Sequence, residues 1–98
     1  ILMRSRYSAY VLKREDYLLS TWHPSTRPVS LRLVAQQPAP TWLGLELRRH
    51  EADDIDHAIV EFVARYRVGG GRAQRLHEVS RFVRENGRWH YLDGEVRA

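Results

Sequence analysis

Two different spacings of hydrophobic residues divide the chain near residue 40. Ahead of that point, hydrophobic side chains recur at intervals of three and four, which is the spacing of one stripe on an α-helix: Met3, Tyr7, Tyr10 and Val11. We therefore predict a helix over residues 1–13 and a shorter one that opens at Asp16 and ends before Pro24. A helical turn over residues 31–35 is also predicted.

Beyond residue 40 the hydrophobic period becomes two, as in a strand with one face on a core. Leu43, Leu45 and Leu47 follow this alternation. Three more strands are predicted between turn-forming residues, over 57–67, 75–85 and 89–93. The sequence therefore predicts a single α+β domain over residues 1–98. In it, N-terminal helices pack on a curved four-stranded antiparallel meander sheet.

Asn86-Gly87 is a strong signal for a two-residue hairpin, and such a turn sets the register of its strands. Because paired positions keep a constant sum, two cross-strand pairs follow: Phe82 with Tyr91, and Ser80 with Asp93. Analogous pairings across the other turns are Tyr66 with Leu76, and Arg48 with Glu61. Together they place the alternating apolar residues and Glu78 on one face, which the helices would cover.

Polar residues on that inner face suggest a ligand pocket, because an unpaired charge in a core costs on the order of several kcal/mol. We predict that the pocket is lined by Tyr7, Tyr10, Trp22, His23, Phe62, Tyr66, Glu78, Ser80, Phe82, Trp89, Tyr91 and Asp93. Glu78 and Asp93 are its candidate catalytic acid or base. The alternative, which we favour, is structural: Ser80 bonds Asp93, and Glu78 pairs with Arg4 or Arg6.

The opposite face of the predicted sheet is unusually apolar for a surface exposed to solvent. It carries Ile59, Val63, Val79, Arg81 and Val83. Such a face often packs against a second copy of itself, so we predict a homodimer. The competing explanation is that valine is simply favoured in half-exposed strands.

Composition narrows the classes of function. The net charge is +4, and Lys13 is the one lysine among sixteen basic residues. The arginines are spread along the chain between acidic residues, which argues against a nucleic-acid surface. No apolar run approaches the ~20 residues that span a bilayer, and we expect a cytoplasmic protein. Cysteine is absent and the histidines lack ligand spacing, so we expect no metal within these residues.

Five blocks in order carry a resemblance to a known family: MRSRYSAY (3–10), TWHP (21–24), VEFVARY (60–66), HEVSRF (77–82) and GRWHYLDG (87–94). The chain resembles the YchJ-like bacterial proteins. The resemblance implies a domain of the nuclear transport factor 2-like superfamily, a cone of helices against a curved sheet around a cavity. Members usually carry a Cys-rich SEC-C zinc motif ahead of the first helix. We therefore expect an upstream zinc segment beyond the present residues, and no cofactor within them.

Two functions of different classes are compatible with this sequence. We favour a non-catalytic module that binds a small ligand or an unidentified protein partner. The alternative is a small hydrolase, isomerase or dehydratase that uses a pocket carboxylate. An open cavity with Glu78 or Asp93 unpaired would favour the enzyme, whereas a closed core with both carboxylates bonded would favour the module.

Overall fold

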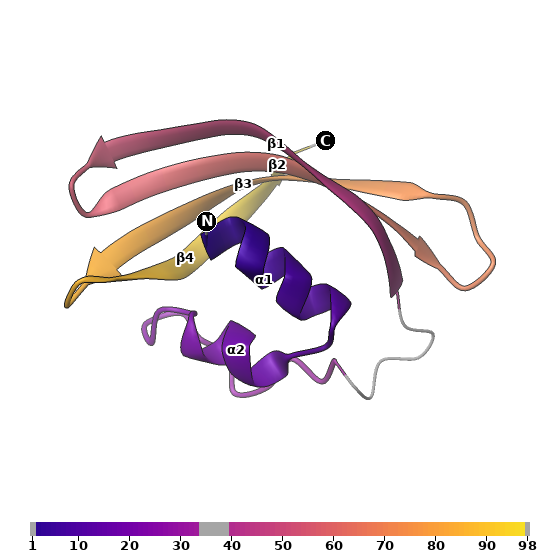
Figure 1. The fold of residues 1–98 in the computed structure, drawn as a ribbon, viewed down its shortest axis with the longest axis horizontal. Coiled ribbons are helices and arrows are strands. Elements are labelled where there is room, and N and C mark those ends of the chain that lie inside the picture. The colour runs from indigo at the N-terminus through magenta and orange to yellow at the C-terminus, as the bar shows by residue number, and fades with distance from the viewer. Residues whose placement is uncertain (1, 34–39, 98) are drawn as a thin grey trace.

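The computed structural model describes residues 2–33 and 40–97. It has two helices and four strands, which run in this order: α1 (Leu2–Val11), α2 (Glu15–Ser20), β1 (Pro40–Asp54), β2 (His57–Val68), β3 (Gln74–Glu85) and β4 (Arg88–Arg97). The strands form one antiparallel sheet in chain order. Figure 1 shows the sheet curving over both helices, which confirms the predicted α+β meander.

Local sequence signals explain where the helices stop. Lys13 has a positive φ of 57°, and Arg14 N–H donates to the Ala9 carbonyl at 2.7 Å, so α1 ends in a Schellman motif. Glu15 and Asp16 then occupy the first turn of α2, where carboxylates favour the helix dipole. The helical turn predicted over 31–35 lies partly outside the described residues, and residues 31–33 are not helical. No described helix is long and apolar enough to cross a membrane.

The β3–β4 hairpin follows the predicted register up to a β-bulge. Asn86 and Gly87 both have positive φ, at 52° and 76°, as a type I′ turn requires. The predicted pairing of Phe82 with Tyr91 is confirmed. The predicted pairing of Ser80 with Asp93 is wrong, because one extra residue is inserted in β4 at a bulge next to Phe82.

The bulge moves the acidic residue to the other face of the sheet. A one-residue shift in a strand exchanges the faces of every side chain beyond it. Ser80 therefore lies opposite Gly94, and Asp93 lies opposite Arg81 on the outer face. The inner face, which the helices cover, keeps Glu78 and Ser80 but loses Asp93.

The other two registers differ from the prediction without exchanging the faces of the core residues. Tyr66 pairs with Gln74 rather than Leu76, a shift of two residues that leaves its side chain on the same face. Arg49, not Arg48, pairs with Glu61, because β1 has a register shift after Leu47.

Strand β1 contributes two of its three alternating leucines to the inner face. Leu45 and Leu47 lie opposite Ala64 and Phe62, as predicted. An irregularity between Trp42 and Gly44 leaves Leu43 40% exposed. Trp42 takes the inner position instead, opposite Tyr66.

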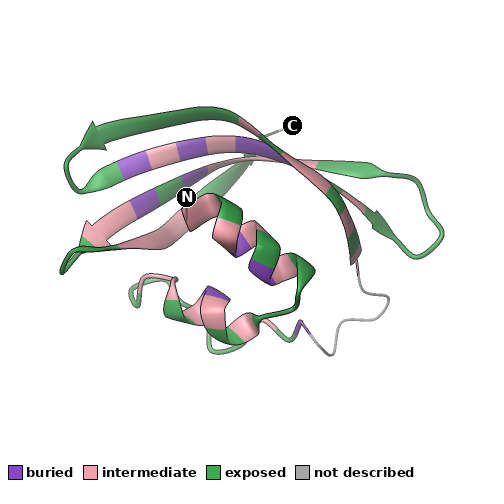
Figure 2. Ribbon diagram, in the orientation of Figure 1, coloured by how far each residue is buried: buried purple, intermediate pink, exposed green. Residues whose placement is uncertain are grey.

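Burial is concentrated in the middle of β2, in the neighbouring part of β3, and where α1 and α2 face each other (Figure 2). The buried inner-face residues of the sheet are Ala58, Val60, Phe62, Ala64, Ser80 and Phe82. Below them, Ala9, Leu18 and Leu33 form a second apolar cluster between the helices and the segment that follows α2. The space between these layers contains the polar residues of the candidate site.

Candidate functional site

A buried arginine joins the helices to the edge of the sheet. Arg6 in α1 is 2% exposed, and its Nη1 donates to the Leu18 carbonyl at 2.8 Å and to Thr21 Oγ1 at 2.6 Å. Its guanidinium carbon lies 5.1 Å from the ring centre of Trp22 and 4.6 Å from that of Tyr91. Burial lowers the pKa of Arg6. The guanidinium therefore lies against two aromatic rings.

The residues after α2 add a short parallel bridge to the free edge of β4. His23 N–H donates to the Tyr91 carbonyl at 2.7 Å, and Tyr91 N–H donates to the Thr21 carbonyl at 2.8 Å. This backbone pairing brings the Trp22 ring to 4.8 Å from the Tyr91 ring, edge to face. Backbone hydrogen bonds therefore position the two rings that contact Arg6.

Glu78 lies in a small polar niche on the inner face. Ser80, which is fully buried, donates to Glu78 Oε2 at 2.7 Å, and the Tyr91 hydroxyl donates to the same oxygen at 3.4 Å. The carboxylate occupies the space beside Gly94, where any Cβ would overlap with it. Burial raises the pKa of Tyr91, and the Glu78 charge adds to this rise. The hydroxyl therefore remains a proton donor to Glu78.

Four aromatic residues from α1, β1 and β2 form the wider end of the helix-covered face. Tyr7 and Tyr10 each lie with ring centres 6.0 Å from Trp42, and Trp42 lies 5.6 Å from Tyr66. Burial raises the pKa of Tyr10. A cavity of about 100 Å³ opens beside Tyr10 and Trp42, with Leu33, Pro40 and Lys13 completing its wall. We call Tyr7, Tyr10, Trp42 and Tyr66 the aromatic mouth.

Comparison with known proteins assigns the family. The family described as "YchJ, middle NTF2-like domain" matches residues 1–94 of the chain. The chain belongs to this family. The YchJ-like blocks that carry the sequence resemblance include both Arg6 and Glu78.

Relatives of this YchJ-like domain are longer than the chain itself. The UPF0225 protein of Polaromonas naphthalenivorans is 63% identical over 94 residues, which cover 96% of this chain and 66% of that protein. The UPF0225 protein of Chromobacterium violaceum is 59% identical over 97 residues, covering 97% of this chain and 71% of that protein. The chain thus spans about two thirds of the length of these relatives.

A solved structure has the same fold. It is the solution structure of RPA3114, a SEC-C motif containing protein from Rhodopseudomonas palustris, with a TM-score of 0.85 and 38% sequence identity. The match covers 99% of this chain and 77% of that protein. The nuclear transport factor 2-like architecture implied by the sequence resemblance is therefore confirmed for the YchJ-like domain.

The structure brings most of the predicted site residues of the YchJ-like domain to the helix-covered side, in two groups. The first group, which we call the Arg6 cluster, consists of Arg6 with Trp22, Glu78, Ser80, Phe82 and Tyr91. The second group, Tyr7, Tyr10 and Tyr66, belongs to the aromatic mouth. Phe62 is buried between these groups. Trp89 lies towards the hairpin end, with the Arg84 guanidinium 5.6 Å from its ring.

Two predicted site residues lie elsewhere. Asp93 is on the outer face, where Arg81 donates to both carboxylate oxygens, at 2.6 and 2.5 Å, and lowers the pKa of Asp93. The His23 ring lies at the β4 edge, with Nε2 at 2.7 Å from Glu85 Oε2 and Nδ1 at 2.7 Å from Ser25 Oγ.

The structural partners predicted for Ser80 and Glu78 are also corrected. Ser80 bonds Glu78 rather than Asp93, because the β4 bulge removes Asp93 from the inner face. Within the described residues Arg6 makes no ion pair with Glu78, because its donors reach the end of α2 and its guanidinium lies against the Trp22 and Tyr91 rings.

Sequence reasoning missed three residues that shape the site: Thr21, Trp42 and Gly94. A glycine inside a strand is a known sign of close approach by another group, so Gly94 carried a signal. The sequence held no such signal for Trp42, because its inner position depends on the irregularity in β1. Among the described residues, no group of three or more His, Asp and Glu side chains is arranged to hold a metal ion.

The outer face of the sheet combines half-buried valines with ion pairs. Glu61 accepts from His77 at 2.6 Å and lies 3.5 Å from Arg49, and the hydrogen bond from His77 lowers the pKa of Glu61. Val63 is 4% exposed although neither described helix covers this face. Side chains of the sheet itself therefore cover much of this apolar surface.

Proposed function

We propose that the domain is a non-catalytic binding module. The observation that supports this proposal most strongly is that both candidate catalytic carboxylates are bonded. Glu78 accepts hydrogen bonds from Ser80 and Tyr91, and Asp93 is held by Arg81 on the other face of the sheet. A carboxylate engaged in this way ties structural elements together and is not positioned to move a substrate proton.

The aromatic mouth is the proposed contact surface for a ligand or a partner. It combines ring faces with the Tyr7 and Tyr10 hydroxyls, and aromatic residues with a polar end are common in binding surfaces. It also borders the small cavity lined by Lys13. A ring-containing or aliphatic group with one polar substituent fits this chemistry.

The proposed module would act beside a further segment of the full-length protein. The solved relative is described as containing a SEC-C motif, and its chain is longer than the matched region. We infer that this chain functions next to such a motif, which the family resemblance associates with zinc. In that arrangement the zinc segment would contact a protein partner while the module binds its ligand.

One observation favours the alternative function, a small hydrolase, isomerase or dehydratase. Glu78 is an inner-face carboxylate that accepts from a tyrosine whose pKa is raised. A carboxylate and a tyrosine in contact can exchange a proton with a bound substrate. The two functions differ in whether Glu78 stabilises the fold.

Substitution of Glu78 by glutamine separates these functions. If Glu78 is structural, Glu78→Gln is expected to lower the free energy of unfolding by about 1 to 3 kcal/mol, because Ser80 and Tyr91 lose a charged acceptor. Urea denaturation measures the difference. Glu51→Gln removes the same charge from an exposed position and is expected to change stability by less than about 0.5 kcal/mol.

The opposite result for Glu78→Gln would support the enzyme. A catalytic carboxylate held at a cost to the fold is relieved when its charge is removed, so the variant would be equally or more stable. Equal stability of wild type and Glu78→Gln would therefore contradict the binding-module proposal.

Homodimerisation through the outer face stays a prediction. Ile59, Val79 and Val83 are half-buried there and offer an apolar centre for a second copy. Wild-type chain is expected to sediment as a dimer, and Val79→Asp as a folded monomer, because a carboxylate would enter a desolvated interface. A monomeric wild type at the highest soluble concentration would contradict this prediction.

A further inference from the structure

Two exposed arginines lie on the outer face near the β2–β3 turn. Arg65 and Arg75 are directly cross-strand partners, and both are exposed. Gly44 is the partner of Arg65 on its other side, in β1. The two cations therefore occupy adjacent strands at one level of the sheet, beside a position without a side chain.

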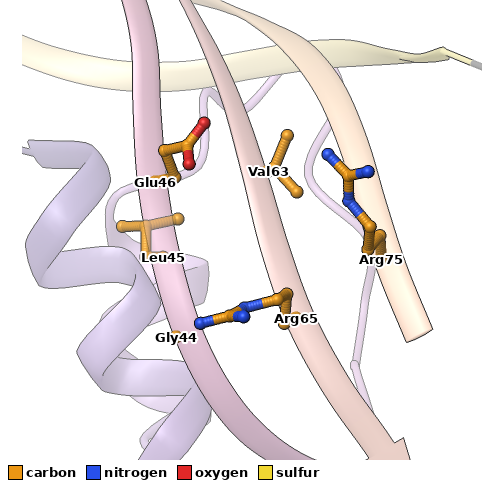
Figure 3. A pocket seen from close by; sticks show the side chains of 6 residues that line it. All are labelled: Gly44, Leu45, Glu46, Val63, Arg65 and Arg75. Carbon is orange, nitrogen blue, oxygen red and sulfur yellow. The ribbon is translucent and has the colours of Figure 1, made fainter. Parts of the chain in front are cut away.

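These residues line a groove on the face opposite the Arg6 cluster. The groove has a volume of about 610 Å³ and is lined by Gly44, Leu45, Glu46, Val63, Arg65 and Arg75. Figure 3 shows Arg65 extending across towards Gly44, and Val63 lying between Glu46 and Arg75. Ligand sites in proteins commonly occupy about 300 to 1,000 Å³, so the groove has the size of a ligand site.

The two arginines are not neutralised by the described part of the chain. Three other arginines of the same face have carboxylate partners, namely Arg49 with Glu61, Arg81 with Asp93, and Arg97 with Glu95, whereas Arg67 has none among the described residues. No carboxylate among residues 2–33 and 40–97 lies within 4.0 Å of Arg65 or Arg75. The remaining residues, 1, 34–39 and 98, include no Asp or Glu. Glu46, the acid that lines the groove, lies 2.7 Å from Arg48.

Like charges on cross-strand neighbours disfavour a sheet, and a bound anion would offset the repulsion between these two arginines. A guanidinium offers planar donors that bind phosphate or carboxylate oxygens two at a time. Gly44 leaves room for the Arg65 side chain, since a Cβ there would lie 3.4 Å from Arg65 Nη2. Val63, buried at the groove floor, provides an apolar contact beside the cations.

We infer that Arg65 and Arg75 form an oxyanion-binding site, which takes a phosphate or carboxylate group of a ligand in the groove at Gly44 and Val63. The site lies on the outer face, whereas the aromatic mouth and Glu78 lie on the helix-covered face. It therefore does not depend on the binding-module proposal, and the Glu78→Gln experiment does not test it.

Titration with two small anions tests this site and identifies the source of the oxyanion. Inorganic phosphate and glutarate are added separately at constant ionic strength, and amide chemical shifts are followed by NMR. We expect saturable shifts for residues 44–46, 63–65 and 75 with at least one of the two. Saturation by phosphate or by glutarate identifies the preferred group. Absence of saturable shifts with both anions would overturn the inference.

Substitutions distinguish a specific anion site from the general attraction of anions to a basic protein. Arg65→Gln and Arg75→Gln are each expected to weaken binding about tenfold or more, the scale of one charge-assisted hydrogen bond. Arg88→Gln removes the same charge from an exposed position at the β3–β4 turn and should leave the affinity unchanged within about twofold. Equal weakening by Arg88→Gln would show nonspecific attraction and overturn the inference.

A steric variant tests the groove without changing its charge. Gly44→Leu places a side chain beside the Arg65 guanidinium and is expected to weaken anion binding several-fold while both arginines remain. Unfolding by urea monitors whether the variant retains its fold. Unchanged affinity in a folded Gly44→Leu protein would show that the anion does not enter the groove, against the inference.

Discussion

Replacing Arg6 with alanine is expected to lower the free energy of unfolding by about 3 kcal/mol. The substitution removes two hydrogen bonds from a charged donor, to Leu18 and Thr21, each of which contributes on the order of 1.5 kcal/mol or more. It also removes the cation that contacts the Trp22 and Tyr91 rings, and it leaves a void in place of the side chain. Relief of the desolvation of Arg6 offsets part of this loss. Urea denaturation followed by circular dichroism measures the difference.

Arg4 provides the matched control for this experiment. It lies on the same helix but is exposed, so Arg4→Ala removes the same charge and is expected to cost less than about 0.5 kcal/mol. A similar small loss for Arg6→Ala would show that Arg6 does not join the helices to the sheet. Arg6→Met keeps the aliphatic stem and is expected to be less harmful than alanine, because it avoids most of the void.

Replacing Tyr91 with alanine is expected to cost about 3 kcal/mol, near the lower end of the range for aromatic residues in cores. The centre of the Tyr91 ring lies 4.8 Å from that of Trp22 and 5.8 Å from that of Phe82, and the ring also contacts the Arg6 guanidinium. Its loss therefore affects the β4 edge, the sheet and α1 together. Chemical denaturation measures the cost.

Tyr91→Phe separates the ring from the hydroxyl. The ring contacts are kept and the hydrogen bond to Glu78 is lost, so the expected cost is about 1 kcal/mol. Combining it with Glu78→Gln should cost less than the sum of the two single losses, because one variant weakens and the other removes the same hydrogen bond. Strict additivity would contradict the Glu78–Tyr91 contact. If Tyr91→Phe is as unstable as Tyr91→Ala, the loss of stability comes from the hydroxyl and not from the ring.

Strand alternation predicts the face of Glu78 correctly and the face of Asp93 wrongly. Glu78 was predicted to lie on the inner face from strand alternation, and it does, since no register shift occurs between β2 and β3 along their paired residues. Asp93 was assigned to the same face by the same reasoning and lies on the other one. The difference is one inserted residue between Tyr91 and Asp93, which alternation along a single strand does not reveal.

Local sequence patterns were sufficient to predict the main helices, the strands and the class of fold. The change of hydrophobic period near residue 40 reflects side-chain geometry within each element, which needs no distant contact. Asn86-Gly87 likewise defines its turn, because both residues tolerate positive φ. The five YchJ-like blocks indicated the family, since each reports a local run of residue types.

Contacts between distant segments decided the site. Arg6 reaches the end of α2 and the rings of Trp22 and Tyr91, which lie up to 85 positions away in the chain (91 minus 6). The opposition of Arg65 and Arg75 depends on the β2–β3 register, and the inner position of Trp42 depends on an irregularity in β1. These features arise from the packing of strands and helices against one another. Hydrophobic period and turn signals describe each element alone, so they cannot specify such partners.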